Sequence, residues 1–225
     1  MKTIRQIDTS RHPCFNKEVK GKFGRIHLPV APLCNIQCNY CNRKYDCVNE
    51  SRPGVTSAIL SPSQSVSYME QVMNKESRIT TVGIAGPGDP LANPAETLAT
   101  IRLIRKKWPD MLICLSTNGL NLPPYLDDLA EIGTSHVTLT VNAVNPEIGR
   151  HFYTWVRDNK VVYRGHQAAE LLLERQLESI RGLKERGIIV KVNTIIVPWM
   201  NDQHSVEVAE RLSHMGVDMH NCMPM

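Results

Sequence analysis

Residues 31–41 read Ala31-Pro32-Leu33-Cys34-Asn35-Ile36-Gln37-Cys38-Asn39-Tyr40-Cys41. Cys34, Cys38 and Cys41 form a Cys-x3-Cys-x2-Cys pattern on this short segment. Because [4Fe–4S] clusters are held by cysteine thiolates, three cysteines this close can bind three irons of one cluster. The pattern offers no fourth cysteine, so one iron stays open, and open positions distinguish reactive metal centres from structural ones. The spacing therefore predicts a reactive iron–sulfur centre.

Structural zinc is the alternative for the same cysteines. Zinc sites usually have four ligands in two paired spacings, and the nearest fourth candidate here is Cys47. A disulfide framework fits less well, because seven cysteines is an odd number and no signal peptide opens the chain. The crowding of the cysteines on one loop favours iron–sulfur binding and leaves zinc as the second interpretation.

The composition narrows the class of protein. A chain of 225 residues with 42% hydrophobic content can bury one sizeable core. The net charge is +4 and the Lys and Arg residues are scattered, so we expect no nucleic-acid partner. The longest apolar runs, such as Ile188-Ile189-Val190, are too short to cross a membrane. With no targeting segment, the expected location is the cytoplasm.

Short β-rich runs alternate with helical patterns along the chain, which predicts βα units and a parallel sheet. Six strands are expected, at residues 25–30, 80–85, 112–116, 136–141, 188–197 and 217–222. Six βα units cannot close an eight-stranded barrel. The predicted fold is therefore an α/β partial (βα)6 TIM-like barrel over residues 25–225, preceded by an N-terminal segment, residues 1–24. In such an array the active site is expected at the carboxyl ends of the strands.

Three helices have clear sequence signals. Ser61 is a predicted N-cap, with Pro62 at the first helical position and Gln64 closing a capping box. The run Asn93-Pro94-Ala95-Glu96 predicts a second helix start by the same chemistry. Residues 168–186 form the clearest amphipathic pattern, and its expected apolar side carries Leu173, Leu177, Ile180 and Leu183.

The spacing of the three cysteines, with the aromatic Tyr40 before the last of them, resembles the radical S-adenosylmethionine (SAM) enzymes. In those enzymes the amino and carboxylate groups of SAM occupy the open iron. The resemblance implies that Cys34, Cys38 and Cys41 hold the catalytic cluster and that Tyr40 lies at the SAM site.

Further polar motifs follow the carboxyl ends of the expected strands. The run Gly86-Pro87-Gly88-Asp89-Pro90 resembles the turn that receives the methionyl amine of SAM, with Asp89 as a charge partner for the ammonium group; an ordinary tight turn is the alternative. The run Ser116-Thr117-Asn118 can hydrogen-bond the ribose or carboxylate of SAM, or cap a helix. Asn142 and Asn193 lie in β-branched strands, where a buried amide needs either a ligand or an internal amide network.

Four other residues are candidate iron ligands, since thiolate and imidazole both bind iron–sulfur clusters: Cys14, His27, Cys47 and Cys114. Cys114 shares a strand face with Ser116 by period-two alternation. The alternative is that these side chains only pack in the core. We predict that His27, Cys47 and Cys114 point into one cavity near the SAM site.

Several long runs narrow the resemblance to the NifB family of radical SAM proteins, which act in nitrogenase cofactor biosynthesis. They are His12-Pro13-Cys14, Arg25-Ile26-His27-Leu28-Pro29-Val30-Ala31-Pro32, the cysteine segment itself, Asp46-Cys47-Val48-Asn49-Glu50-Ser51-Arg52-Pro53-Gly54-Val55, Gly86-Pro87-Gly88-Asp89-Pro90, Ser116-Thr117-Asn118-Gly119 and Leu139-Thr140-Val141-Asn142-Ala143-Val144-Asn145-Pro146. Together these runs extend over most of the chain.

The resemblance implies an activity. Proteins of this family fuse two substrate [4Fe–4S] clusters around a carbide, which comes from the methyl group of SAM. A second SAM is cleaved to a 5′-deoxyadenosyl radical that takes hydrogen from that methyl group. The cluster ligands implied for the substrates are His27, Cys14, Cys47 and Cys114. The implied cofactors are SAM, the catalytic [4Fe–4S] cluster and one or two further clusters. The implied partners are cluster donors, a low-potential electron donor and cofactor carrier or scaffold proteins.

The family usually has a further Cys-x-x-Cys tail, and often a small carrier domain, beyond the region seen here. Neither occurs within the 225 residues, so we expect the second substrate cluster to be weakly held. Two other classes stay open. One is a radical SAM enzyme acting on a small organic substrate, which would leave His27 and Cys114 without iron. The other is an iron–sulfur scaffold that does not cleave SAM.

Overall fold

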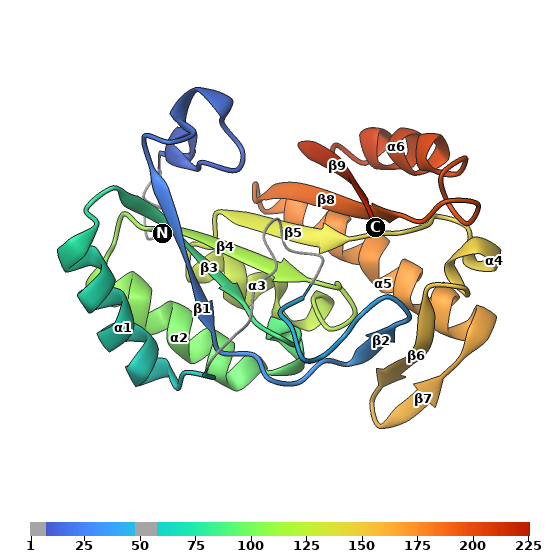
Figure 1. Ribbon diagram of the computed structural model, residues 1–225, viewed down its shortest axis with the longest axis horizontal. Coiled ribbons are helices and arrows are strands. Elements are labelled where there is room, and N and C mark those ends of the chain that lie inside the picture. Colours follow the sequence, from blue (N-terminus) through green and yellow to red (C-terminus); the bar gives the residue numbers. More distant parts are fainter. Residues whose placement is uncertain (1–7, 48–57) are drawn as a thin grey trace.

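The computed structural model describes residues 8–47 and 58–225. A parallel six-stranded sheet has the order β1-β3-β4-β5-β8-β9. Figure 1 shows the long helices α1, α2 and α5 lined up along this sheet. The strands are β1 Gly24–Pro29, β3 Ile79–Ala85, β4 Leu112–Thr117, β5 His136–Thr140, β8 Ile189–Ile196 and β9 Met219–Pro224. All six expected strands are present within a few residues, and the α/β prediction is confirmed.

The helices follow the strands as βα units require. They are α1 Pro62–Lys75, α2 Pro94–Lys107, α3 Leu126–Glu131, α4 Pro146–Gly149, α5 Gly165–Glu185 and α6 Ser205–His214. Short 3-10 turns lie at Thr9–Arg11, Lys17–Val19, Pro90–Ala92 and Pro123–Tyr125. Within the described part of the chain, no helix is long and apolar enough to serve as a membrane span.

The two faces of the sheet differ in polarity. One face, with residues such as Ile84, Leu115 and Val192, is fully buried against the apolar sides of the helices. Since side chains alternate along a strand, the opposite face carries the intervening residues, and many of these are polar, such as Ser116 and Thr138. The main apolar core is therefore outside the barrel, and the inner face is left for chemistry.

The sheet curls so that its edge strands approach each other. Arg25 and His27 of β1 line the same cavity as Lys191 of β8 and Met219 and Asn221 of β9, although β1 and β9 lie at opposite ends of the strand order. Residues of the N-terminal segment, including Cys14 and Phe15, line this cavity as well. The N-terminal segment thus covers the opening between the two edges near the amino ends of the strands.

The two predicted helix caps have different outcomes. At α1 the capping box is confirmed: the Gln64 amide donates to Ser61 Oγ at 3.3 Å, and the Ser61 amide donates to Gln64 Oε1 at 2.9 Å. At α2 the predicted chemistry is wrong, because the Asn93 side chain makes no cap hydrogen bond. It instead accepts from the Leu33 amide at 3.3 Å and donates to the Leu33 carbonyl at 2.8 Å. Asn93 therefore fastens the segment that leads into the cysteine motif.

Helix α5 buries only part of the expected side. Ile180 and Leu183 are fully buried as predicted, whereas Leu173 and Leu177 are only partly buried. The buried stripe includes the polar Gln176 and Ser179. Gln176 Nε2 donates to the carbonyls of Asn118 at 2.9 Å and Thr140 at 2.8 Å. Apolar periodicity could not identify all of this side, because polar residues that satisfy strand-end carbonyls take part of it.

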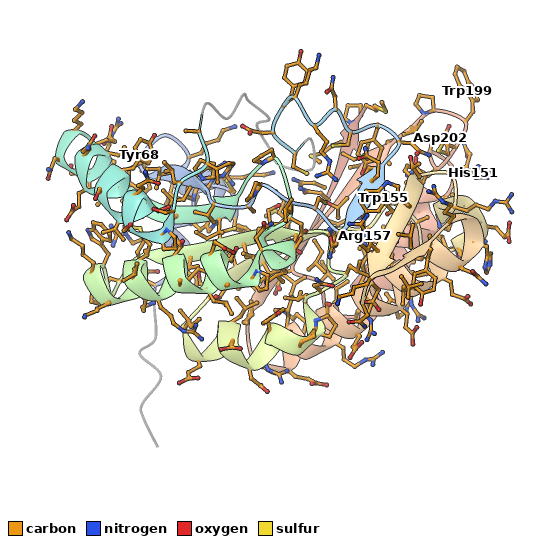
Figure 2. The ribbon with its side chains drawn as sticks, turned by 90° about the horizontal axis from the view of Figure 1, so that it is seen from below. Tyr68, His151, Trp155, Arg157, Trp199 and Asp202 are labelled. Atoms are coloured by element: carbon orange, nitrogen blue, oxygen red, sulfur yellow. The ribbon has the colours of Figure 1, made fainter. Side chains whose placement is uncertain are left out.

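A second, antiparallel sheet was not expected from the sequence. It contains β2 Ile36–Cys38, β6 Tyr153–Asp158 and β7 Val161–Tyr163, in the order β2-β6-β7. Figure 2 shows Trp155 and Arg157 on β6, where the guanidinium lies 5.2 Å from the indole ring. The middle of the cysteine motif is therefore a strand, and the β6–β7 hairpin holds it in place.

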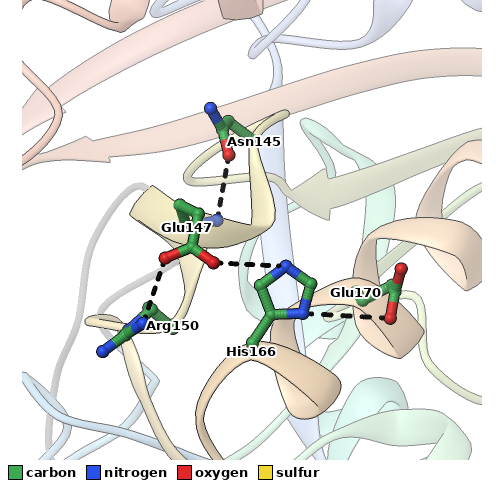
Figure 3. Close-up of polar contacts among 5 residues, drawn as sticks. All are labelled: Asn145, Glu147, Arg150, His166 and Glu170. Carbon is green, nitrogen blue, oxygen red and sulfur yellow. Dashed lines mark hydrogen bonds and ion pairs between the residues drawn. The ribbon is translucent and has the colours of Figure 1, made fainter.

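Polar contacts tie α4, just before this hairpin, to the start of α5 (Figure 3). Asn145 accepts from the Glu147 amide at 2.9 Å, and the Glu147 carboxylate pairs with Arg150 at 3.0 Å and with His166 at 3.4 Å. His166 also lies 3.9 Å from Glu170. Exposed pairs of this kind contribute about 1 kcal/mol at most, so they orient the helices more than they stabilise them.

Candidate functional site

One pocket at the carboxyl ends of β1, β3, β4 and β5 brings together most of the predicted site. Its lining includes the predicted residues Cys34, Cys38, Tyr40, Cys41, Cys47, Pro87, Gly88, Asp89, Ser116, Thr117 and Asn118, with Ile36, Arg43 and Thr140. Gly86, Asn142 and Asn193 lie outside this lining. Loops separated by up to about a hundred residues in sequence therefore converge where parallel strands end, as the fold class requires.

The cysteine segment is held in shape by hydrogen bonds around its backbone. The Cys41 amide donates to the Cys38 carbonyl at 3.1 Å. Gln37 Nε2 donates to the carbonyls of Cys38 at 3.0 Å and Cys41 at 3.3 Å, and Arg43 donates to the Ile36 carbonyl at 2.6 Å. These bonds fold the segment into a compact loop with its three thiols toward one pocket.

Burial dominates the proton affinity of the thiols. It raises the pKa of Cys34 to about 11 and that of Cys38 to about 12. Metal binding needs thiolates and so releases protons. The protein alone therefore keeps these thiols protonated, and iron must supply the positive charge that stabilises the bound thiolates.

Asp89 is buried in the wall of the pocket, and its carboxylate is hydrogen-bonded within the protein. Its carboxylate accepts from Thr117 Oγ1 at 2.9 Å, from the Asn118 amide at 2.6 Å and from the Leu91 amide at 2.8 Å. A second contact from Thr117 Oγ1 at 3.1 Å reaches the other oxygen. A carboxylate has about four acceptor positions, so these donors occupy most of them. Burial raises the pKa of Asp89 despite these bonds. The geometry favours a positioning role over the expected pairing with the ammonium group of SAM.

Asn118 connects β4 directly to the cysteine motif. Its Nδ2 donates to Asn35 Oδ1 at 2.7 Å and lies 3.8 Å from Cys34 Sγ. Its Oδ1 accepts from the Leu120 amide at 2.9 Å. Ser116 lines the pocket from the same strand end. Asn118 therefore positions the first cysteine, whereas contact of Ser116 with the ribose or carboxylate of SAM stays a prediction.

The glycines of the 86–90 turn allow it to approach the chain itself. A Cβ on Gly88 would lie 2.0 Å from the Leu33 carbonyl oxygen, and one on Gly86 would lie 2.7 Å from the Ala31 oxygen. The Gly88 amide donates to that Ala31 oxygen at 2.9 Å. The sequence predicted close approach to a ligand; the structure shows close approach to the backbone that carries the cysteines.

Replacing Gly88 by alanine should therefore displace the cysteine segment, because backbone at 2.0 Å from the new Cβ cannot yield as a flexible side chain can. We expect loss of iron from the cysteine motif and a lower melting temperature, measured by iron content and thermal unfolding. Gly24→Ala is the matched control, since its new Cβ would meet mainly the mobile tip of Ile79 at 2.8 Å. Full iron content in Gly88→Ala would contradict this packing argument.

Asn142 is part of an internal amide network. Its Nδ2 donates to Tyr40 Oη at 2.8 Å, and its Oδ1 accepts from the Ile195 amide at 3.0 Å. Its backbone carbonyl accepts from Asn201 Nδ2 at 2.9 Å. Of the two interpretations left open by the sequence, the network is the one observed. Asn193 is buried in β8, in register with Thr140 of β5, and its expected contact with SAM stays a prediction.

Asn142→Leu should destabilise the fold by about 2 kcal/mol, because the buried Ile195 amide loses its acceptor. Urea unfolding of the cluster-free protein measures this change. Tyr40→Phe removes only the hydroxyl at the other end of the same hydrogen bond, so its effect should be smaller. Equal unfolding midpoints for Asn142→Leu and the parent protein would show that the network does not stabilise the fold.

The four other candidate ligands divide between two levels of the barrel. Cys47 lines the pocket of the cysteine motif, whereas His27 and Cys14 line the cavity near the amino ends of the strands. Cys114 is buried on the inner face of β4, in register with Gly83, and a Cβ on Gly83 would lie 2.9 Å from His27 Nε2. Among the described residues, Cys47 and His27 line different cavities and Cys114 is in the lining of neither, so the single shared cavity stays a prediction.

Two buried histidines near Cys14 and Cys114 were not predicted from the sequence as site residues. His12 and His136 have ring centroids 4.3 Å apart, and burial lowers the pKa of His12 to about 2 and that of His136 to about 4. Ser135 Oγ donates to the Ile113 carbonyl, so it must accept from His136 Nδ1 at 2.9 Å. His136 Nε2 then carries a lone pair, which has no partner in the part of the chain that the structure describes. Only the His12-Pro13-Cys14 run signalled this region.

A family model identifies the class of protein to which this chain belongs. The model of the radical SAM superfamily matches residues 28–212, which include the cysteine motif, four strands of the large sheet in full (β3, β4, β5 and β8) and the end of β1. The chain belongs to the radical SAM superfamily.

Within that superfamily, the chain is similar to proteins named FeMo cofactor biosynthesis protein NifB. It is 56% identical over 218 residues to that of Chlorobaculum tepidum, covering 97% of this chain and 51% of the relative. It is 48% identical to that of Klebsiella pneumoniae, covering 95% of this chain and 46% of the relative, and 47% identical to that of Azotobacter vinelandii, covering 95% and 42%. The chain spans about half the length of these curated relatives.

Solved structures support the fold. The crystal structure of Streptococcus suis SuiB bound to S-adenosylmethionine matches with a TM-score of 0.63 at 13% identity, covering 92% of this chain and 42% of that one. Methylornithine synthase (PylB) matches with a TM-score of 0.60 at 17% identity, covering 92% and 56%. At these identities the likeness shows a shared architecture alone.

Proposed function

We propose that this chain is the radical SAM core of an enzyme that fuses two [4Fe–4S] clusters and inserts a carbide derived from SAM, forming the precursor of the nitrogenase cofactor. The observation that carries the proposal is the meeting of three cysteines, the 86–90 turn and the 116–118 run in one pocket. The similarity to NifB proteins supports the cofactor-building role.

The donor set fits an iron–sulfur cluster better than zinc. Throughout residues 8–47 and 58–225, no three His, Cys, Asp or Glu side chains converge closely enough to hold a single metal ion. A structural zinc ion requires four ligands around one point. A cubane instead binds each thiolate at a different iron, so its ligands surround a volume. Cys34, Cys38 and Cys41 line one pocket, and three thiolates match a cluster with one open iron better than a four-ligand zinc site.

When bound there, the cluster supplies the electron for reductive cleavage of SAM. The protein's own contribution is position and exclusion of water. Asn118 and Asn93 fix the segment around Cys34 through hydrogen bonds to Asn35 and Leu33. The β6 strand fixes Cys38. Ser116 and the backbone of the 86–90 turn, which also line the pocket, would orient SAM there.

The substrate clusters would occupy the inner face of the barrel. We infer that Cys47, which lines the pocket of the cysteine motif, contacts a cluster from the SAM side. Cys14 and His27, which line the other cavity, would contact a cluster from the opposite side together with Cys114. A barrel with polar and thiol side chains on its inner face suits an inorganic substrate better than an apolar organic one. Cluster donors, a low-potential electron donor and a cofactor carrier or scaffold in the cytoplasm would complete the pathway.

The test is anaerobic incubation of the reduced, cluster-loaded chain with SAM labelled in its methyl carbon. We expect 5′-deoxyadenosine and label in an acid-stable iron–sulfur product. Cleavage of SAM with label found only in an organic compound would favour the small-substrate alternative. Iron binding with no SAM cleavage would show a scaffold and would contradict the proposal.

A further inference from the structure

The cavity at the amino ends of the strands is strongly basic. It has a volume of about 860 Å³, which lies within the ~300–1,000 Å³ range of ligand sites. Its lining contains Lys17, Lys20, Arg25 and Lys191, and it contains no Asp or Glu among the residues the structure describes. A concave surface lined by charge of one sign concentrates ligands of the opposite sign.

Lys191 is the buried one of these four cations. It lies on β8 with 4% of its surface exposed. Burial lowers the pKa of Lys191, and the ionisable groups near enough to affect that pKa are Cys14, Cys114 and Arg25, with no carboxylate within the described ranges among them. Its ammonium nitrogen lies 5.8 Å from the centroid of the Phe15 ring. Lysine is almost never buried without a partner, because taking its charge out of water is costly.

The surroundings of Lys191 define the chemistry of the missing partner. Cys14 and Cys114 both influence the ammonium electrostatically, and Cys114 is itself influenced by Cys14, Arg25 and Lys191. Two thiols and two cations thus lie near one another on the inner face of the barrel, where Cys114 and Lys191 are buried and Cys14 and Arg25 are half-buried. Thiols bind soft metal centres as thiolates, and the negative charge that they and bridging sulfides bring needs cations nearby.

We propose that Lys191 is a positioning residue for the anionic iron–sulfur substrate, with its ammonium donating to sulfur of a cluster bound on the inner face of the barrel beside Cys14 and Cys114. This inference rests on the proposed function and adds the substrate's charge as the feature that is recognised. The basic cavity is then the opening through which an anionic cluster enters, on the side of the barrel away from SAM.

Loss of the Lys191 ammonium should change the reduction potential of the substrate cluster. Net charge and hydrogen bonds to sulfur set the reduction potential of an iron–sulfur cluster, and a cation that donates to sulfur favours the reduced state. Removing the Lys191 ammonium should therefore lower the reduction potential of the substrate cluster. The cluster of the cysteine motif lies in the other pocket and should keep its own signal.

The experiment compares the parent chain with Lys191→Met, Lys191→Arg and the control Lys106→Met, which removes an exposed lysine of α2. Each is reconstituted anaerobically with iron and sulfide, and iron content, melting temperature and the EPR-monitored reduction potential of each cluster are measured. SAM addition identifies the signal of the cysteine-motif cluster. For Lys191→Met we expect either about four fewer irons per chain or a substrate-cluster potential lower than the parent's. Lys191→Arg should restore both, and the control should match the parent.

The outcomes separate this inference from the proposed function. A parent chain with a single cluster, or one that does not cleave SAM, would contradict the proposed function itself. A Lys191→Met protein with full iron content and an unchanged potential would overturn the inference alone. So would a lower melting temperature together with loss of the SAM-responsive signal, because Lys191 would then support the fold instead of the substrate.

Discussion

Cys38→Ala should reduce the cleavage of SAM to 5′-deoxyadenosine to the background of the assay. Cys38 is the middle ligand of the proposed cluster and lies in β2, buried with 7% exposure. With two of the three thiolates left, the cluster would lose one of its three protein anchors, and no other cysteine follows until Cys47. The measurement is anaerobic turnover of the dithionite-reduced protein, with product separated by chromatography.

Cys222→Ala is the matched control for this experiment. Cys222 is also a strand cysteine, but it is exposed and lies in β9, outside the pocket of the cysteine motif. We expect parental cleavage rates in the control. If Cys38→Ala still cleaves SAM at the parental rate, the cysteine motif does not bind the catalytic cluster, and the main argument for the active site is lost.

The six strands of the large sheet could be predicted because each carries a strong local signal. Runs such as 112–116 are rich in β-branched and aliphatic residues that pack under the helices. The grouping of motifs at the carboxyl edge followed from parallel topology alone. The positions of Gly88, Ser116 and Asn118 in one pocket thus needed no tertiary information beyond the fold class.

The anchoring of the cysteine segment could not be predicted. Residues 36–38 pair with residues 153–156, more than a hundred positions away, and β2 is only three residues long. Such a pairing depends on a hairpin whose register has no local signature in the cysteine run. Asn93 is a similar case, since its side chain contacts Leu33, sixty residues earlier, in place of the helix end that it precedes.

The position of each candidate ligand along the barrel axis also could not be predicted from the sequence. Alternation gives the face of a strand, and it placed His27 and Cys114 on the inner face. The relative height of two strands depends on their register, and only the structure shows Cys114 opposite Gly83 and His136. The separation of Cys47 from His27 is a consequence of that register and of the path of the 31–47 segment.

Cys114→Ala should remove the substrate cluster while the cluster of the cysteine motif stays bound. Cys114 is on the same face of β4 as Ser116 but two residues nearer the amino end, so it lies below the pocket that would hold SAM. Burial raises its pKa to about 11, which the cations Arg25 and Lys191 partly offset. A bound iron would stabilise the thiolate much further, so the cluster and this thiol should depend on each other.

We expect Cys114→Ala to contain about four fewer irons per chain, to keep the EPR signal that changes on SAM addition, and to transfer no labelled methyl carbon to an iron–sulfur product. Ile113→Val, one residue earlier and on the helix side of β4, is the control for loss of packing, and it should retain both clusters. The small-substrate alternative predicts the opposite for Cys114, namely parental iron content, because that thiol would then be a packing residue. Full iron content together with parental methyl transfer in Cys114→Ala would therefore remove Cys114 from the proposed ligands and place the substrate cluster elsewhere in the barrel.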